Sequence, residues 1–365
     1  MKKLTGILIA VLVAFSACTK VERDPMPAGK IAFTVGNYAH RTKADPDTLG
    51  FSTISTSFRS RAFLHAAGVN SVQHFFGEGS GERVAYDSVN NIWAPGADTG
   101  FEYYWPLSSD SHINFVCWYD KNGAPDTLAI SETSLGWSAR TIVADDDILY
   151  ADEAWHYNDN ENGRFEASEG VPVLFHHALA QLGFRARIAD GCAADGDIHW
   201  EVGLVNVSLE GVYHTGTLSL VNSEPAGTSP ATRAWDVVDD TWTSLTDRDS
   251  ISIVGSTPVI LDSLYHLDTL MLARTVLPQT VSNDVVLRLT YQIRTFYGES
   301  NAPYSVEHID FSGRMIDLVP SIDTWEMSHR IMYTLSIDPK TQTILLSPTL
   351  SDWNPIAGGG DITIQ

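Results

Sequence analysis

Short segments rich in β-branched and aromatic residues recur along this chain, and each is bounded by Gly, Pro, Asn or Asp. Examples are "KIAFTVG", "HINFVCWY", "WEVGLVNVSL" and "DVVLRLTYQIRTFY". Many alternate apolar with polar residues, which is the period of a strand with one buried face. Only "PVLFHHALAQLGFRARI" could pass as a helix, and its apolar pattern better fits a strand on either side of a short turn. The pattern predicts an all-β chain built of antiparallel sandwiches.

The first residues have the form of an export signal. Two lysines precede an uncharged apolar run over residues 4–15, which is too short for a stable bilayer-spanning helix. Two small residues then precede Cys18, the arrangement that a lipoprotein signal peptidase cuts. We therefore predict a signal peptide with its anchor at residues 1–18, an acylated Cys18 and a polar tether at residues 19–29. The alternative is an ordinary secretory signal with an incidental cysteine.

The charge of the chain bears on its partners. Asp and Glu number 45 against 23 Lys and Arg, which gives a formal net charge of −22. Such a chain repels phosphate backbones and anionic lipid headgroups, so nucleic acid is not expected as a partner. We expect contact with a membrane only through the lipid anchor.

Length and composition suggest two domains. The chain that remains after the signal has more residues than a typical single domain. Its clearest break is "HYNDNENGRFEASEG", a stretch with few apolar residues near the middle. We predict an N-terminal sandwich domain over residues 30–165 and a C-terminal one over residues 166–365.

Two cysteines remain beyond the anchor. Cys117 lies in the apolar stretch "INFVCWY" and is expected to face a core, whereas Cys192 lies in the turn-rich "DGCAADGD". Their spacing predicts no disulfide framework, and a single bond between them remains an alternative.

No motif of catalysis stands out. The chain has no G-x-S-x-G elbow, Walker loop, G-x-G-x-x-G or H-E-x-x-H, so we predict that it is not an enzyme and holds neither cofactor nor metal. His176 and His177 would point to opposite faces of a strand and could not share a metal ion, so one should be buried and hydrogen-bonded. The runs 145–147 and 195–197 are expected to be acidic turns. One loop has calcium-like spacing but too little carboxylate charge, so solvated linker is the better interpretation; its residues are Asn158, Asn160, Asn162, Gly163 and Glu169.

Ten tryptophans allow a second kind of function, because exposed indole rings can stack on sugars. Those within or beside apolar strands are expected in the core: Trp105, Trp118, Trp325 and Trp353. Those among polar residues are better candidates for ligand contact: Trp137, Trp155, Trp235 and Trp242.

Taken in order, several fragments resemble the fimbrillin-like proteins, the subunits of type V pili. They are the lipoprotein start, "KIAFTVG…RTKA", "FEYYWPL", "DDDILYADEA", "VPVLFHHALAQLGFRARI", "VNVSLEGVYHTGTLSL", "VLPQTVSNDVVLRLTYQI" and "WEMSHRIMYTLSIDPKTQTILLSPTLSDW". One departure is local: similar proteins tend to carry a Gly and a Tyr where this chain has Met327, Ser328 and His329. The resemblance implies two transthyretin-like sandwich domains in tandem, export to the outer membrane as a lipoprotein, clipping after an Arg by an arginine-specific surface protease, and strand exchange between pilus subunits.

The residues at the start of the mature chain are compatible with such processing. Ile31, Phe33 and Val35 alternate on one face of a first strand, and a polar loop with Arg41 follows. We predict the cut after Arg41, with Arg59 and Arg61 as the next candidates. Loss of the first strand would then expose a sheet edge and an apolar groove. Alternatively, Arg41 is an ordinary loop charge.

The C-terminal tail offers a strand to refill that groove. Ile362 and Ile364 follow a flexible run of glycines, Gly358–Gly360, at a two-residue period, so we predict a donor strand within residues 358–365. Alternatively, the tail is the last strand of its own domain. The main hypothesis is thus a pilus subunit for cell adhesion, with a host or microbial surface ligand as a further partner. The second is a monomeric surface lipoprotein that binds glycans through its tryptophans.

Overall fold

The computed structural model describes most of the chain between residues 29 and 363. The described ranges are 29–35, 57–88, 92–106, 110–123, 127–143, 146–157, 170–223, 231–236, 242–254, 258–261, 272–352 and 362–363. Apart from one short helix, α1 (Met315–Leu318), the regular elements of these ranges are all strands. This confirms the predicted all-β fold. No helix in these ranges is long and apolar enough to cross a bilayer.

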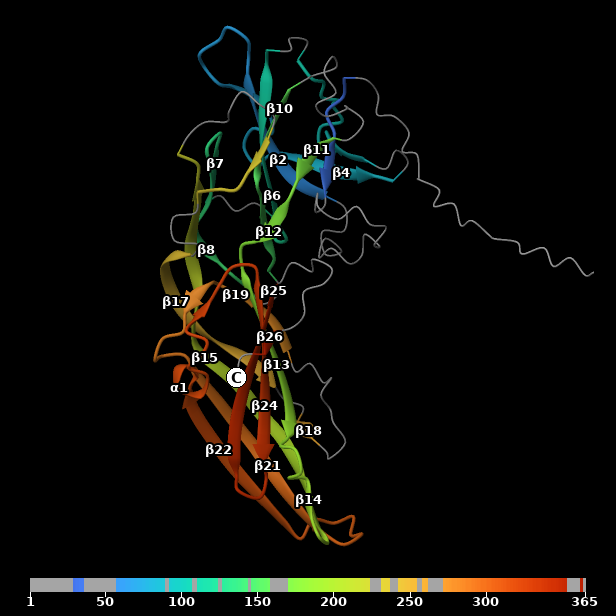
Figure 1. Cartoon of the computed structure of the whole chain (residues 1–365), viewed down its shortest axis with the longest axis vertical. Helices are drawn as coiled ribbons and strands as arrows, with labels where there is room; N and C mark the ends of the chain where they lie inside the picture. Colours follow the sequence, from blue (N-terminus) through green and yellow to red (C-terminus); the bar gives the residue numbers. More distant parts are fainter. Residues whose placement is uncertain are drawn as a thin grey trace, which may run out of the picture.

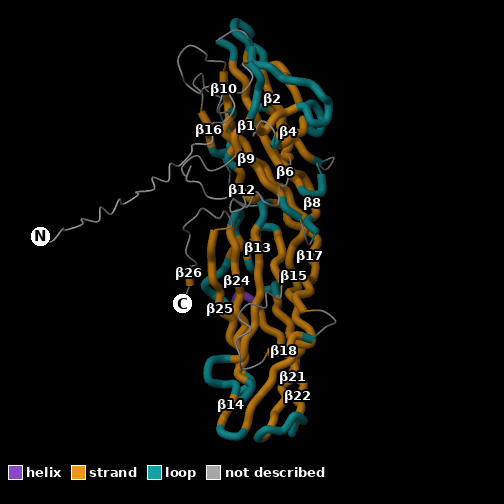
Figure 2. The backbone as a smooth tube through the Cα atoms, turned by 90° about the vertical axis from the view of Figure 1, so that its right-hand side faces the viewer, coloured by secondary structure: helices purple, strands orange, loops and turns teal. Residues whose placement is uncertain are grey.

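The largest sheet has eleven strands and lies at one end of the elongated molecule (Figures 1 and 2). Its strands are β1 (Phe33–Val35), β2 (Ser57–His65), β3 (Gln73–Phe76), β4 (Glu82–Asp87), β5 (Ile92–Pro95), β6 (His112–Asp120), β9 (Ile148–Ala151), β10 (Glu153–Tyr157), β11 (Val171–Val173), β12 (Phe175–His177) and β16 (Ala231–Arg233). The main path of neighbours runs β11-β1-β5-β4-β2-β6-β10-β16.

Three further sheets complete the molecule. An eight-stranded sheet contains β7 (Leu128–Ser131), β8 (Ser134–Thr141), β14 (Ala194–Asp195), β15 (Ile198–Val221), β17 (Thr243–Val254), β18 (Val259–Leu261), β21 (Val286–Tyr297) and β22 (Ser305–Arg314). A five-stranded sheet contains β13 (Ala180–Ile188), β19 (Leu272–Val276), β24 (His329–Asp338), β25 (Thr343–Asp352) and β26 (Ile362–Thr363). A small pair joins β20 (Gln279–Thr280) to β23 (Thr324–Trp325).

β15 is one strand of 24 residues that serves both ends of the molecule. At about 3.3 Å per residue it is roughly 80 Å long. Its first part packs with the five-stranded sheet, where Leu204 and Leu209 share a core with Phe184 and Tyr333. Its last part pairs with β8 and shares another core with Trp118 of the eleven-stranded sheet. The two sandwiches are therefore built on one continuous strand.

Strand pairing crosses the boundary predicted at residues 165 and 166. β11 and β12 follow that point in the chain, yet they pair with β1 and β9 of the eleven-stranded sheet. β7 and β8 precede it, yet β8 pairs with β15. Composition marks polar connections, whereas hydrogen-bonded ladders join residues far apart in sequence, so the polar stretch did not locate the division between sheets. The strand–turn–strand predicted over residues 172–188 is present, with β11 and β12 before the turn and β13 after it.

The two described cysteines are free thiols. Cys117 is 1% exposed on β6, and burial raises the pKa of its thiol to about 12. Cys192 is partly exposed. Cys117 lies in a core, as the sequence predicted. The alternative, a disulfide between Cys117 and Cys192, is not present in the structure.

We expect a protein expressed without Cys18 to react with a maleimide in two steps. Cys192 should react in the folded state, and Cys117 only after denaturation, because a buried protonated thiol is a poor nucleophile. Mass spectrometry of the native and denatured protein counts the labels. Equal labelling of both thiols in the native protein would show that β6 is not packed as described.

Candidate functional site

The first strand, β1, is held on both of its edges. It pairs in parallel with β11 over Phe33 to Val35, and antiparallel with β5 where Phe33 faces Trp93. Just before β1, the backbone N–H of Ile31 donates to the carbonyl of Tyr103 at 2.8 Å. β1 is therefore an internal strand. Its removal would leave a slot between β5 and β11, with an unpaired edge on each of these two strands.

Side chains of this segment belong to the core. Ile31, Ala32 and Phe33 are each 2% exposed, and Val35 is half-buried against the same cluster as Ile31 and Phe33. The Phe33 ring meets Phe58 edge to face at 5.7 Å between centroids, and Phe115 at 5.2 Å. We call the space filled by residues 31–35 between β5 and β11 the β1 slot.

Gly170 allows β11 to approach β1 so closely. Its φ is +74°, and a Cβ built there would lie 2.9 Å from the carbonyl carbon of Phe33. Any other residue would clash with the backbone in the slot as well as strain its own. On the β11 side, the β1 slot is therefore shaped to hold the backbone of an extended strand in close contact.

Charged groups mark the start of the β1 slot. Lys30 forms an ion pair with Glu102, and the Tyr104 hydroxyl donates to the other oxygen of Glu102 at 2.6 Å. The hydrogen bonds from Lys30 and Tyr104 lower the pKa of the Glu102 carboxyl. A negative charge therefore stands beside the position of Lys30.

The predicted processing residues fall in different places. Arg41 and Cys18 lie outside the described residues. Arg59 and Arg61 lie within β2, which is paired with β4 on one edge and β6 on the other. The guanidinium of Arg61 donates to the carbonyl of Ile130 at 3.2 Å. A protease binds its substrate as an extended segment whose backbone is free to pair with the active site. The peptide bonds after Arg59 and Arg61 are therefore not accessible in the folded protein.

The C-terminal tail is seen only at residues 362 and 363. They form β26, which pairs with β25 through Ile362 with Leu350 and Thr363 with Thr349. In this structure the tail is the last strand of its own sheet, the alternative that the sequence left open. Ile364 and the glycines at 358–360 lie outside the described residues.

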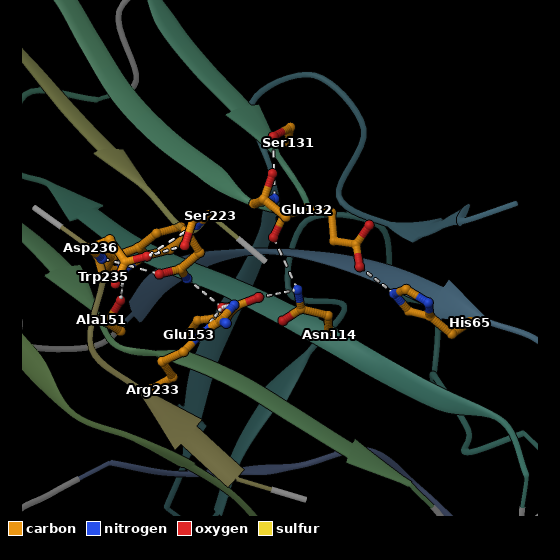
Figure 3. A network of polar contacts seen from close by, with 12 residues as sticks. His65, Asn114, Ser131, Glu132, Ala151, Glu153, Ser223, Arg233, Trp235 and Asp236 are labelled. Carbon is orange, nitrogen blue, oxygen red and sulfur yellow. Dashed lines mark hydrogen bonds and ion pairs between the residues drawn. The ribbon is translucent and has the colours of Figure 1, made fainter. Parts of the chain in front are cut away.

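A buried polar network that sequence reasoning missed joins β16 to β10 (Figure 3). Glu153 of β10 is fully buried, and both Nε and Nη2 of Arg233 donate to its Oε2, at 3.1 and 2.5 Å. Asn114 of β6 donates to Oε1 at 2.6 Å, and Asn222 at the end of β15 donates to Oε2. Glu153 stands in the acidic segment "DDDILYADEA" and Arg233 is 80 residues away, so no local pattern could have indicated the pair.

The paired histidines occupy opposite faces of β12, as predicted. His177 is buried and its Nδ1 lies 2.9 Å from Asp147 Oδ1, while His176 is half-buried with Nε2 2.9 Å from Asp152 Oδ1. Of the expected acidic turns, the one at 145–147 contributes two buried carboxylates, Asp146 and Asp147. Nowhere in the described ranges do three His, Cys, Asp or Glu side chains gather as metal ligands would. The calcium-like loop at 158–169 lies outside those ranges.

The tryptophans proposed for ligand contact are in the core. Trp137 is fully buried, Trp235 is 5% exposed and Trp242 is 2% exposed. The indole N–H groups of Trp235 and Trp242 each donate to a backbone carbonyl at 2.7 Å. That prediction was wrong: Trp137 lies in β8, where polar neighbours alternate to the opposite face, whereas Trp235 and Trp242 lie outside the strands and are buried against a core. Trp118 and Trp325 are buried as predicted and Trp105 is partly buried, while Trp353 and the Trp155 side chain are not described.

Comparison with known proteins finds structural likeness only. No family model matches the chain, and no curated protein matches it in sequence. A fimbrial protein from Bacteroides vulgatus superposes with a TM-score of 0.49 at 16% identity, over 89% of this chain and 99% of that one. A candidate cell adhesion protein from Bacteroides uniformis gives 0.43 at 14%, over 89% and 98%. A fimbrial assembly protein from Parabacteroides distasonis gives 0.36 at 8%, over 92% and 98%.

These names agree with the fimbrillin-like resemblance of the sequence. Superpositions this loose carry no argument about what the chain binds or does. The function of the chain is therefore argued from the geometry of the β1 slot.

Proposed function

We propose that this chain is a structural pilus subunit that is exported as an outer-membrane lipoprotein through Cys18, clipped after Arg41 and joined to other subunits at the cell surface by strand exchange. The observation that carries the proposal is β1. It is a short strand that fills a core between two other strands, and residues 36–56, with Arg41 among them, connect it to β2. One cut in that connection would allow a core strand to leave, and β5 and β11 would then lose the strand that pairs with both of them.

The energetics suit an exchange. Burial of Ile31 and Phe33 contributes about 4 kcal/mol at ~2 kcal/mol for each side chain. While the chain is intact, β1 is held next to its slot by covalent attachment. After a cut it can diffuse away, and a strand from a neighbouring subunit can recover the same burial and backbone hydrogen bonds. An empty slot exposes apolar side chains and unpaired backbone groups, so a subunit is more stable with a donor strand bound. This favours a polymer.

The donor in this proposal is an extended C-terminal strand of a neighbouring subunit. Within the described residues, β26 pairs with β25 at two positions, on the edge of the five-stranded sheet. Release of an edge strand breaks a ladder on one side only. The C-terminal tail is thus available to reach another molecule.

Replacement of Arg41 by Lys tests the processing step. Treated with an arginine-specific protease, the wild-type protein should lose an N-terminal fragment ending at Arg41 and form ladders in SDS gels, whereas Arg41→Lys should do neither. Trypsin also cuts after lysine, so it should restore both in Arg41→Lys when Lys43, a second trypsin site, is replaced by Gln in the same protein. N-terminal sequencing of the trimmed protein should read from Thr42.

Two results would count against the proposal. Ladders of equal intensity from the variant with the arginine-specific protease would move the cut away from Arg41. A clipped protein that remains monomeric after the fragment is lost would remove strand exchange as the function. The glycan-binding alternative is left without its main support, because three of its four tryptophans are buried.

A further inference from the structure

We infer that the β1 slot selects a strand with an aromatic residue two positions after an aliphatic one, so that a subunit which offers such a segment refills it in preference to residues 361–365 of a second copy of this chain. This inference rests on the proposed exchange and names its partner. It follows from comparison of the strand that fills the slot here with the tail that this chain itself could donate.

The slot has one site of aromatic size. Phe33 is 2% exposed, and its ring is enclosed edge to face by Phe58 at 5.7 Å and Phe115 at 5.2 Å. Both neighbours lie on central strands, β2 and β6, which are paired with each other along their length. Because these rings cannot close in, a smaller side chain in place of Phe33 would leave a void.

Residues 361–365, part of the predicted donor strand, read Asp-Ile-Thr-Ile-Gln and contain no aromatic residue. With Ile362 in the position of Ile31, Ile364 would enter the ring site and Thr363 would replace the buried Ala32. Ile364 is too small to fill the site of the Phe33 ring. Thr363 would bury a hydroxyl where Ala32 has only a methyl group.

Charge opposes the same register. Asp361 would occupy the place of Lys30, beside the Glu102 carboxylate with which Lys30 now forms an ion pair. A shift by two residues would instead bring Asp361 to the position of Ala32, which is 2% exposed. Reversal of the strand would put Ile362 in the ring site, with the same shortfall in size. None of these three placements of residues 361–365 reproduces the fit of β1.

The partner should therefore offer a basic or neutral residue, an aliphatic residue, a small residue and an aromatic residue in succession. Lys30 to Phe33 is itself such a segment. A pilus subunit with this slot would accept a subunit that offers such a segment in preference to residues 361–365 of its own kind.

Peptide exchange tests the selection without any change to the protein. The chain expressed without its signal is clipped with an arginine-specific protease and incubated with fluorescent peptides, and bound peptide is measured by polarisation and by the shift in melting temperature. The peptides are residues 29–36, the same with Phe33→Ala, residues 358–365, and the tail with Ile364→Phe. We expect the 29–36 peptide to bind about tenfold or more tighter than the wild-type tail and than its own Phe33→Ala variant.

The tail with Ile364→Phe should recover a substantial part of that affinity, and Asp361→Lys should add to it at low salt but less at high salt. Equal binding of the wild-type tail and the 29–36 peptide would overturn the selection while leaving exchange intact. If no peptide binds and the native fragment stays on the clipped protein, the exchange fails and the inference fails with it.

Discussion

Phe33→Ala should lower the free energy of unfolding by about 3–5 kcal/mol, the usual loss when a buried phenylalanine is truncated in a core that cannot close. The ring is 2% exposed and lies between Phe58 and Phe115 on two central strands. Urea denaturation followed by tryptophan fluorescence measures the change. The same substitution should let β1 leave faster after a cut at Arg41, since less burial holds it in place.

Thr34→Ala is the matched control, because Thr34 is in the same strand but is only half-buried. We expect it to cost under about 1 kcal/mol. A Phe33→Ala protein as stable as the control would mean that β1 does not fill a core. The proposed slot would then have no driving force for exchange.

Arg233→Ala should destabilise the protein by about 2–4 kcal/mol. Glu153 is fully buried and would lose Arg233, its cationic partner within the part of the chain that the structure describes, while the hydrogen bonds from Asn114 and Asn222 remain. Removal of one partner from a buried ion pair is costly because the other charge cannot be rehydrated in the fold. The expected loss of stability is smaller than for a fully buried ion pair, because the Arg233 side chain is 27% exposed and partly screened by water. Chemical denaturation at neutral pH measures the change.

An exposed ion pair provides the control for this prediction. Arg288 contacts Glu210 with side chains 54% and 38% exposed, so Arg288→Ala should change stability by less than about 1 kcal/mol. In addition, Glu153→Gln combined with Arg233→Ala should be less unstable than the sum of the two single changes, because the orphaned charge is gone. Equal effects of Arg233→Ala and Arg288→Ala would show that β16 is not tied to β10 by this pair.

The same network explains why sequence patterns located single strands but not their assembly. Glu153 has the charge of a solvated residue, yet it is fully buried beside β16, the strand that pairs with β10. Trp235 and Trp242 were misread for the same reason, since the long polar connection around them packs its indoles against the core. Periodicity reports which residues share a face, and it does not report what covers that face.

The sequence by itself determined the all-β class, the strands over residues 172–188, the opposite faces of His176 and His177, and the burial of Cys117, Trp118 and Trp325. These follow from local alternation, which acts within a few residues. Only the tertiary structure decided that β1 is an internal strand, that β15 runs through both sandwiches and that Arg233 neutralises Glu153. Those features depend on hydrogen-bonded ladders and ion pairs between residues far apart in the chain, and no local period encodes such partners.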